Sequence, residues 1–192
     1  MLREMTSTMV EGRLELIGDF VNTRDVEHGE DEVGSPAALR DWLVERGLVD
    51  VATPADVPAH ARALAVREGI RALGRANNDE PLDHATLAAM NTAARAAPLV
   101  MTIGRPGAGE SWRLSPHAEG VDGFVGRLLA ALAASMADGS FSRLKACRND
   151  TCQWLFHDGS RNRSGTWCSM AGCGSRMKSR AYRARQRESA TA

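Results

Sequence analysis

The feature that most constrains the fold of this chain is the placement of its four cysteines. They form two pairs in which each pair encloses four residues, and fifteen residues separate the pairs: Cys147, Cys152, Cys168 and Cys173. Two close pairs of thiolates can surround a tetrahedral zinc ion, and four thiolates leave no open position for a substrate or a water. The spacing therefore predicts a closed, structural zinc (Zn²⁺) site that organises a small fold around it.

Other interpretations of the cysteines are weaker. Unrelated core cysteines would rarely pair this regularly. Four thiolates also bind iron, so an iron–sulfur or redox centre is the alternative metal site. His157 lies between the pairs and is a candidate substitute ligand, although a histidine beside a turn is more often exposed. The four cysteines are sufficient by themselves.

The expected compartment supports metal over disulfides. The first residues lack the apolar centre of a signal peptide, and no apolar run approaches the roughly 20 residues that span a bilayer. We therefore expect a cytoplasmic protein with no membrane partner, whose thiols stay reduced.

The charge of the chain is divided unevenly. The formal net charge is zero, but residues 143–192 carry +8 and residues 1–142 carry −8. An acidic body with a basic end indicates contact with nucleic acid.

The basic charge is concentrated in a predicted helix that follows Cys173. At 100° per residue, four arginines fall within about 60° of one another: Arg176, Arg180, Arg183 and Arg187. Lys178 and Arg185 lie on the opposite side, and a small apolar face is expected to pack on the zinc site: Met177, Ala181 and Ala184. A solvated face is the usual interpretation of charged helix residues, but like charges four residues apart repel, which favours a polyanionic partner. Arg161 and Arg163, between the cysteine pairs, would add to the same surface.

Upstream, hydrophobic spacing predicts a mostly helical domain, residues 1–140. Helices are expected at 13–23, from Ser35-Pro36 to Gly47, at 55–76, from Asp83 to Pro98 and at 121–137. A β-hairpin is expected from Leu99–Ile103 and Ser111–Ser115 around a glycine-bearing loop, and Asp25–Gly34 is expected to be a mobile, solvated loop.

Residues 141–192 are expected to form a small treble-clef-like zinc finger. The predicted order is a strand at Gln153–His157, a turn at Asp158–Ser160, a returning strand at Thr166-Trp167 and the basic helix after Cys173. The predicted class of the whole chain is therefore α+β.

Two stretches resemble known families. Residues 156–178 are similar to the CGNR zinc finger, whose name motif falls on Cys173-Gly174-Ser175-Arg176. Asp19-Phe20-Val21-Asn22-Thr23 is similar to the DFVNT signature that opens the ABATE domain, the usual companion of that finger. The resemblance implies a bacterial stress-type transcription regulator with the four cysteines as zinc ligands and a DNA-binding finger. Ser175 stands where the family motif has Asn, so its hydroxyl would weaken or replace any hydrogen bond that the amide makes.

The sequence thus favours a zinc-dependent transcription regulator that presents its Arg-rich helix to DNA, with an N-terminal domain for effector sensing or dimerisation. An RNA-binding or ribosome-associated adaptor using the same finger is the alternative. An enzyme is disfavoured because the body shows no nucleophile–base pair or open metal triad. Asp19 and Asn22 lie three residues apart on an otherwise apolar helix, where they could line a small-molecule effector pocket or hydrogen-bond a neighbouring loop. The second role is favoured because buried polar groups are ordinarily satisfied locally.

Overall fold

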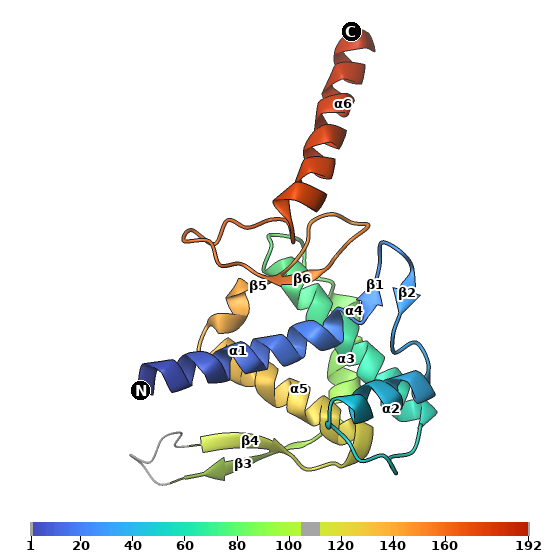
Figure 1. Cartoon of the computed structure of the whole chain (residues 1–192), viewed down its shortest axis with the longest axis vertical. Coiled ribbons are helices and arrows are strands. Elements are labelled where there is room, and N and C mark those ends of the chain that lie inside the picture. The colour runs from blue at the N-terminus through green and yellow to red at the C-terminus, as the bar shows by residue number, and fades with distance from the viewer. Residues whose placement is uncertain (1, 105–111, 192) are drawn as a thin grey trace.

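The computed structural model describes residues 2–104 and 112–191, so most of the predicted loop of the second hairpin lies outside the described residues. The body holds five helices, α1 (Leu2–Val21), α2 (Pro36–Glu45), α3 (Val57–Ala76), α4 (His84–Ala94) and α5 (Gly120–Ala137), within the described ranges. Two antiparallel hairpins accompany them, β1 (Arg24–Asp25) with β2 (Glu30–Asp31) and β3 (Leu99–Ile103) with β4 (Trp112–Pro116) (Figure 1). The predicted α+β class, with a mostly helical body, is confirmed.

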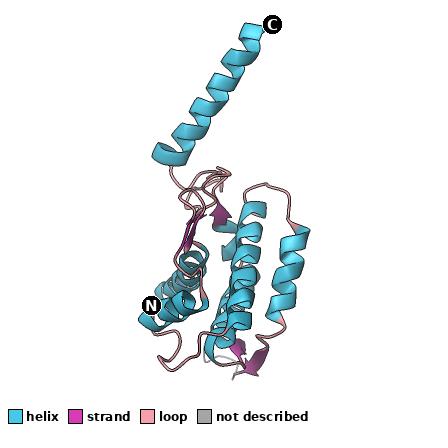
Figure 2. Cartoon of the chain, turned by 90° about the vertical axis from the view of Figure 1, so that its right-hand side faces the viewer, coloured by secondary structure: helices cyan, strands magenta, loops and turns pink. Residues whose placement is uncertain are grey.

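The C-terminal part forms around a third hairpin. It consists of a 3₁₀ turn η1 (Ser140–Arg143), strands β5 (Leu144–Ala146) and β6 (Leu155–His157), a single π-helical turn η2 (Met170–Gly174) and α6 (Ser175–Thr191). Helix α6 projects away from the rest of the molecule, as two perpendicular views show (Figures 1 and 2). A hairpin and a helix therefore lie beside the cysteines, as expected, although the hairpin pairs β6 with β5.

Side-chain caps explain where three body helices begin. The Ser35 hydroxyl accepts a hydrogen bond from the Ala38 amide (3.2 Å) ahead of Pro36, and Asp56 accepts from the Ala59 amide (3.0 Å). Asp83 caps α4 by accepting from the amides of Ala85 and Thr86 (both 3.0 Å). Each acceptor satisfies an amide that has no partner within its helix. The starts predicted at Ser35 and Asp83 are confirmed.

The core of the body lies where α1, α2 and α5 meet over α3. Phe20 and Phe124 contact edge to face with ring centroids 5.0 Å apart, and Trp42 lies 5.7 Å and 6.1 Å from them. All three side chains are buried. Among the described residues, α5 alone is long and apolar enough to cross a membrane, but half of it is buried inside the protein, as expected for a core helix.

The segment expected to be a mobile loop is instead the β1–β2 hairpin and its continuation. Val33 is completely buried in the core, and the Asp31 carboxylate accepts hydrogen bonds from both terminal nitrogens of Arg67 (2.7 Å each). The sequence prediction was wrong here because the acidic composition of the segment conceals one buried valine and one buried ion pair.

The hydrophobic core of the body continues into the C-terminal part. Phe141, Leu144, Ala146 and Leu155 are buried in the same cluster as the body core. A Cβ atom added at Gly74 of α3 would lie 2.8 Å from Leu155 Cδ1 and 3.3 Å from the Ala146 nitrogen. A side chain at this position would require Leu155 and the backbone at Ala146 to shift, so the end of α3 packs directly on the β5–β6 hairpin.

Strand β6 pairs with β5 and not with Thr166-Trp167, so the predicted returning strand is wrong. The Thr166 carbonyl accepts hydrogen bonds from the Arg148 amide (3.2 Å) and from the Asn78 side chain (2.9 Å), while Trp167 packs against the cysteines. The backbone of this segment is used to attach the cysteine loops to the body.

Candidate metal centre and cationic helix

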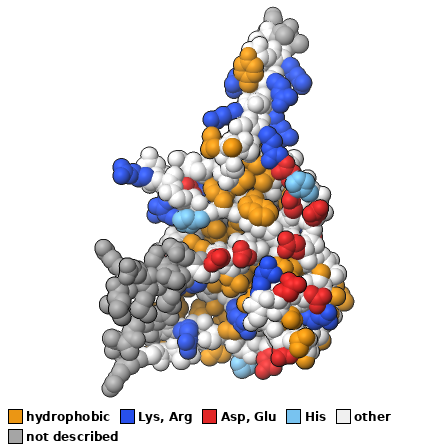
Figure 3. All heavy atoms as spheres, in the orientation of Figure 1, with side chains coloured by type: hydrophobic (Ala, Val, Ile, Leu, Met, Phe, Trp, Pro, Cys, Tyr) orange, Lys and Arg blue, Asp and Glu red, His pale blue; other side chains and the backbone are white. Residues whose placement is uncertain are grey.

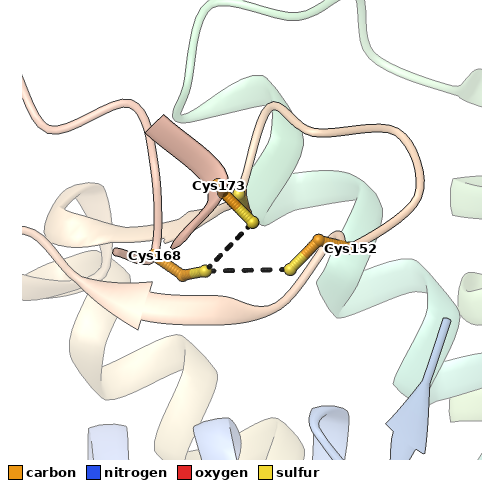
Figure 4. A group of neighbouring side chains, drawn as sticks. Cys152, Cys168 and Cys173 are labelled. Atoms are coloured by element: carbon orange, nitrogen blue, oxygen red, sulfur yellow. Dashed lines mark hydrogen bonds between the residues drawn. The ribbon is translucent and has the colours of Figure 1, made fainter. Parts of the chain in front are cut away.

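The four cysteine sulfurs converge at one point. All four Sγ atoms lie within 4.8 Å of one another. Figure 4 shows three of them, with Cys152–Cys168 at 3.7 Å and Cys168–Cys173 at 3.8 Å. A zinc ion with Zn–S bonds of about 2.3 Å at the centre of a tetrahedron requires sulfurs about 3.8 Å apart. These separations are far longer than the roughly 2.05 Å of a disulfide. The geometry and the soft donor set fit a structural zinc ion.

The protonation of these thiols explains why a cation is needed. The hydrogen bond from Cys152 lowers the pKa of Cys147 to about 5. The same contact, together with burial, raises the pKa of Cys152 well above its ordinary value, and burial raises that of Cys168 to about 12. One thiolate therefore opposes the ionisation of its neighbours, and a bound divalent ion is what would allow all four to ionise.

In each cysteine loop, a backbone carbonyl shortly after the first cysteine accepts a hydrogen bond from an amide at or just after the second cysteine. The Asn149 carbonyl accepts from the amides of Cys152 (2.7 Å) and Gln153 (3.1 Å), and the Ser169 carbonyl accepts from the Gly174 amide (2.9 Å). The Asn149 side chain, which is buried, also donates to Cys173 Sγ (3.5 Å). Sequence reasoning missed Asn149, although an Asn between two ligand cysteines is a usable signal for such a contact.

A buried ion pair holds the loop between the cysteine pairs. Lys145 Nζ donates to the Asp158 carboxylate (2.8 Å), and the side chains are 6% and 2% exposed. Asp158 also accepts from the amides of Ser160 (3.0 Å) and Gly165 (2.9 Å). Although burial opposes it, these hydrogen bonds, led by that from Lys145, lower the pKa of Asp158. The predicted turn at Asp158 is present, but its ion pair was not foreseen.

Arg176 differs from the other arginines of its predicted ridge. Its guanidinium donates to Cys173 Sγ (3.2 Å) and forms an ion pair with both carboxylate oxygens of Glu27 in the β1–β2 turn. The Glu27 contact raises the pKa of Arg176 and lowers that of Glu27. Arg176 therefore connects the cysteine cluster to the acidic hairpin. The neighbouring Ser175 hydroxyl donates to the Met170 carbonyl (3.0 Å), so at this position the hydroxyl joins α6 to η2.

Beyond its first turn, α6 is surrounded by solvent. The cationic side chains there are exposed: Lys178, Arg180, Arg183, Arg185 and Arg187. The Arg183 Nε donates to the Ser179 carbonyl of the same helix (3.2 Å). Ala181 and Ala184 are also exposed and only Met177 is half-buried, so the expected packing of an apolar face on the zinc site is wrong. The helix points away from the cysteines and cannot fold back onto them.

Arg161 and Arg163 are exposed on the loop between the cysteine pairs. Arg163 has a φ of +52° and donates to the Ser142 hydroxyl (3.3 Å). The structure thus places both residues on the surface of the C-terminal part, and their contact with nucleic acid stays a prediction.

The two candidate effector residues of α1 have different surroundings. The Asn22 side chain donates to the Leu155 carbonyl (2.9 Å) and accepts from the Leu155 amide (2.8 Å), whereas Asp19 is exposed. The contacts of Asn22 match the second of its two predicted roles, a local hydrogen bond to a neighbouring segment. An effector pocket at Asp19 and Asn22 stays a prediction.

Polar side chains in α3 and just after it hydrogen-bond the segments where the body meets the C-terminal part. Arg71 is buried and donates to the Val21 carbonyl (2.7 Å), the Gln153 carbonyl (3.1 Å) and Glu68 (3.0 Å). Asn78 donates to the Ala146 carbonyl (2.8 Å). Sequence reasoning missed this network, because its acceptors are backbone groups that no side-chain motif reveals.

Two family models match parts of this chain. A family model named ABATE and described as "Putative stress-induced transcription regulator" matches residues 14–139. A second model, the CGNR zinc finger, matches residues 143–186, which include all four cysteines and most of α6. No curated protein matches the chain.

Proposed function

The chain belongs to the ABATE family of transcription regulators and ends in a CGNR zinc finger, and from this premise we propose that it regulates transcription by binding DNA through α6. The four cysteines would hold a structural zinc ion, and α6 would be the DNA-binding element. This extends the family description to particular residues of this chain.

The observation that carries the proposal is the free-standing cationic helix. From Lys178 to Arg187, α6 carries five cationic side chains, no acidic one and no buried one. These residues extend over roughly 15 Å of helix at 1.5 Å per residue. Closely spaced exposed charges of one sign repel one another, and a polyanion removes that repulsion.

Zinc, when bound, would supply rigidity and no reactivity, because four thiolates fill its coordination shell. Around it, Asn149 and Arg176 donate to Cys173 Sγ, which offsets part of the negative charge of the thiolates. Since Cys173 lies in η2, two residues before α6 begins, a fixed Cys173 would fix the direction in which α6 leaves the body. The residues at the cluster are thus positioning groups for the helix.

For the body we propose a regulatory role, namely the sensing of an unidentified effector or the formation of a homodimer. The description of the family as a regulator supports a non-enzymatic protein. A regulator that contacts the genome would act in the cytoplasm of a bacterial cell.

The test is a fluorescence-anisotropy titration of the zinc-loaded chain against a mixed-sequence DNA duplex of about 30 base pairs. We expect the logarithm of the affinity to fall linearly with that of the salt concentration, by about 0.9 for each phosphate contacted. Binding should decline when a chelator removes the zinc. Absence of salt-sensitive binding by the zinc-loaded chain would overturn the proposal, and a preference for structured RNA at equal salt would favour the adaptor function instead.

A further inference from the structure

We propose that α6 lies lengthwise in the major groove of B-form DNA, with cations on both of its sides against the two phosphate walls and one polar face toward the base edges. The inference rests on the proposed function and specifies how that site recognises its partner. It follows from how the side chains are distributed around the helix axis.

The cations of α6 form two rows on opposite sides. At 100° per residue, the first row spans about 60° and contains Arg176, Arg180, Arg183 and Arg187. The second row, Lys178 and Arg185, spans about 20° and lies roughly 180° from the middle of the first. A helix that contacted a single strand or a flat anionic surface would bring only one row of cations to the phosphates. The second row would face solvent.

Two opposed rows match the walls of a groove. The major groove of B-form DNA is about 12 Å wide, and a helix with its side chains is about 10–12 Å across. The minor groove is only about 6 Å wide, and the major groove of A-form RNA is too deep and narrow for side chains to read. The projection of α6 beyond the body leaves its length accessible to a duplex (Figures 1 and 2).

The faces between the rows differ in chemistry. One carries Ser179, Tyr182 and Gln186, all exposed, within about 60°. The other carries Met177, Ala181 and Ala184, which offer no N–H or O–H donors. Base edges are read by hydrogen bonds, and a glutamine can contact adenine through two of them. The polar face is therefore assigned to the floor of the groove.

Charge on the body opposes docking of a duplex across the face that carries the β1–β2 hairpin. Acidic side chains gather on the face over the β1–β2 hairpin, directly below the start of α6, whereas the blue side chains follow the helix (Figure 3). Glu27, Glu30 and Glu32 belong to that hairpin segment. A duplex that lay across the body would meet these carboxylates, so the duplex is expected to contact the projecting part of α6.

The experiment uses the zinc-loaded full chain and one sequence in three forms. The first is an unmodified DNA duplex, the second carries glucosylated 5-hydroxymethylcytosine, which fills the major groove, and the third is the same sequence as double-stranded RNA. We expect affinity for the second and third to fall roughly tenfold or more. Saturating an A·T-rich form of the duplex with the minor-groove ligand netropsin should change affinity by less than about twofold.

Failure of the proposed function and failure of major-groove docking would give different results. If the unmodified duplex is not bound, the proposed function itself fails. If it is bound but the glucosylated duplex is bound equally well, or netropsin displaces the protein, DNA binding stands and major-groove docking is overturned.

Variants of each face test the orientation. Lys178→Ala with Arg185→Ala should lower the salt slope by about two, since both cations would contact phosphates, whereas docking by the first row alone predicts no change. Gln186→Ala should keep the salt slope and weaken the sequence preference recovered by selection from random duplexes. An unchanged preference in Gln186→Ala and Tyr182→Phe would overturn the assignment of the polar face.

Discussion

Helices α3 and α6 carry similar ladders of arginines in opposite environments. The ladder of α3 is Arg62, Arg67, Arg71 and Arg75, and that of α6 is Arg176, Arg180, Arg183 and Arg187. In both, neighbours are three to five residues apart. Every arginine of the α3 ladder has a carboxylate partner within 3.0 Å: Asp122, Asp31, Glu68 and Glu80 respectively. On α6, Arg176 is paired with Glu27, while Arg180 and Arg183 contact Met177 and the Ser179 carbonyl of their own helix.

The comparison shows that spacing alone does not assign a role to an arginine ladder. Within α3, carboxylates and backbone carbonyls surround the guanidinium groups, so the ladder holds α1, the β1–β2 hairpin and β6 together. Around most of α6 there is only solvent. Carboxylates around α3 make its ladder part of the internal structure, whereas Arg180 and Arg183 of α6 are exposed and accessible to a partner.

The largest expected effect is on stability. Replacing the buried Arg67 by alanine removes its hydrogen bonds to Thr23 and Asp31 and leaves a cavity, so the free energy of unfolding should fall by about 3 kcal/mol. Arg183→Ala should change it by no more than about 0.5 kcal/mol. Urea unfolding of both variants measures the difference. Equal effects would remove the distinction between the ladders.

The second effect is on DNA binding. The double variant Arg180→Ala with Arg183→Ala should lower the salt slope by about two, because two phosphate contacts are lost. Its melting temperature should be unchanged. Arg127→Ala, at an exposed position of α5, is the control and should leave the slope as it is. A double variant with an unaltered slope would show that the exposed ladder is only solvated.

The third effect is the acid sensitivity of the α3 ladder. Burial opposes ionisation of Asp31, but the hydrogen bonds from Arg67 lower its pKa below the ordinary aspartate value. Its stabilising contribution is therefore complete above about pH 4 and is lost as the pH falls through the lowered folded value. Unfolding measured from about pH 6 downward should show a steeper loss in the wild type than in Asp31→Asn. Parallel curves would contradict the assignment.

The smallest effect concerns Arg176, which belongs to the α6 ladder but, like the arginines of the α3 ladder, is paired with a carboxylate. Glu27→Gln releases Arg176 from its carboxylate and should tighten DNA binding by roughly twofold to fivefold. Glu30→Gln changes the net charge equally on the same hairpin and is the control, because no ion pair joins Glu30 to Arg176 among the described contacts. Equal gains in the two variants would mean that net charge alone is responsible.

Much of this fold and of the metal site was predictable because the signals are local. The caps at Ser35 and Asp83, the apolar stripe of α5 and the paired cysteine spacing depend on residues only a few positions apart. The β5–β6 pairing, the burial of Val33 and the hydrogen bonds of Arg71 depend on segments far apart in the chain. Predictions from composition were least accurate where a few buried residues lay within a charged segment, as in the β1–β2 hairpin.

The close contact between Gly74 of α3 and the β5–β6 hairpin limits how the C-terminal part can be exchanged between related chains. Because Leu155 and the backbone at Ala146 would have to shift to admit a larger residue at Gly74, the surface beneath the cysteine loops fits closely to the end of α3. A segment beginning at β5, transplanted onto another protein, would expose Leu144 and Leu155 and lose the Asn22 and Asn78 side chains that hydrogen-bond its backbone. Exchange of the C-terminal part between related chains should therefore succeed only when the end of α3 travels with it, so the two halves are expected to be inherited as a pair.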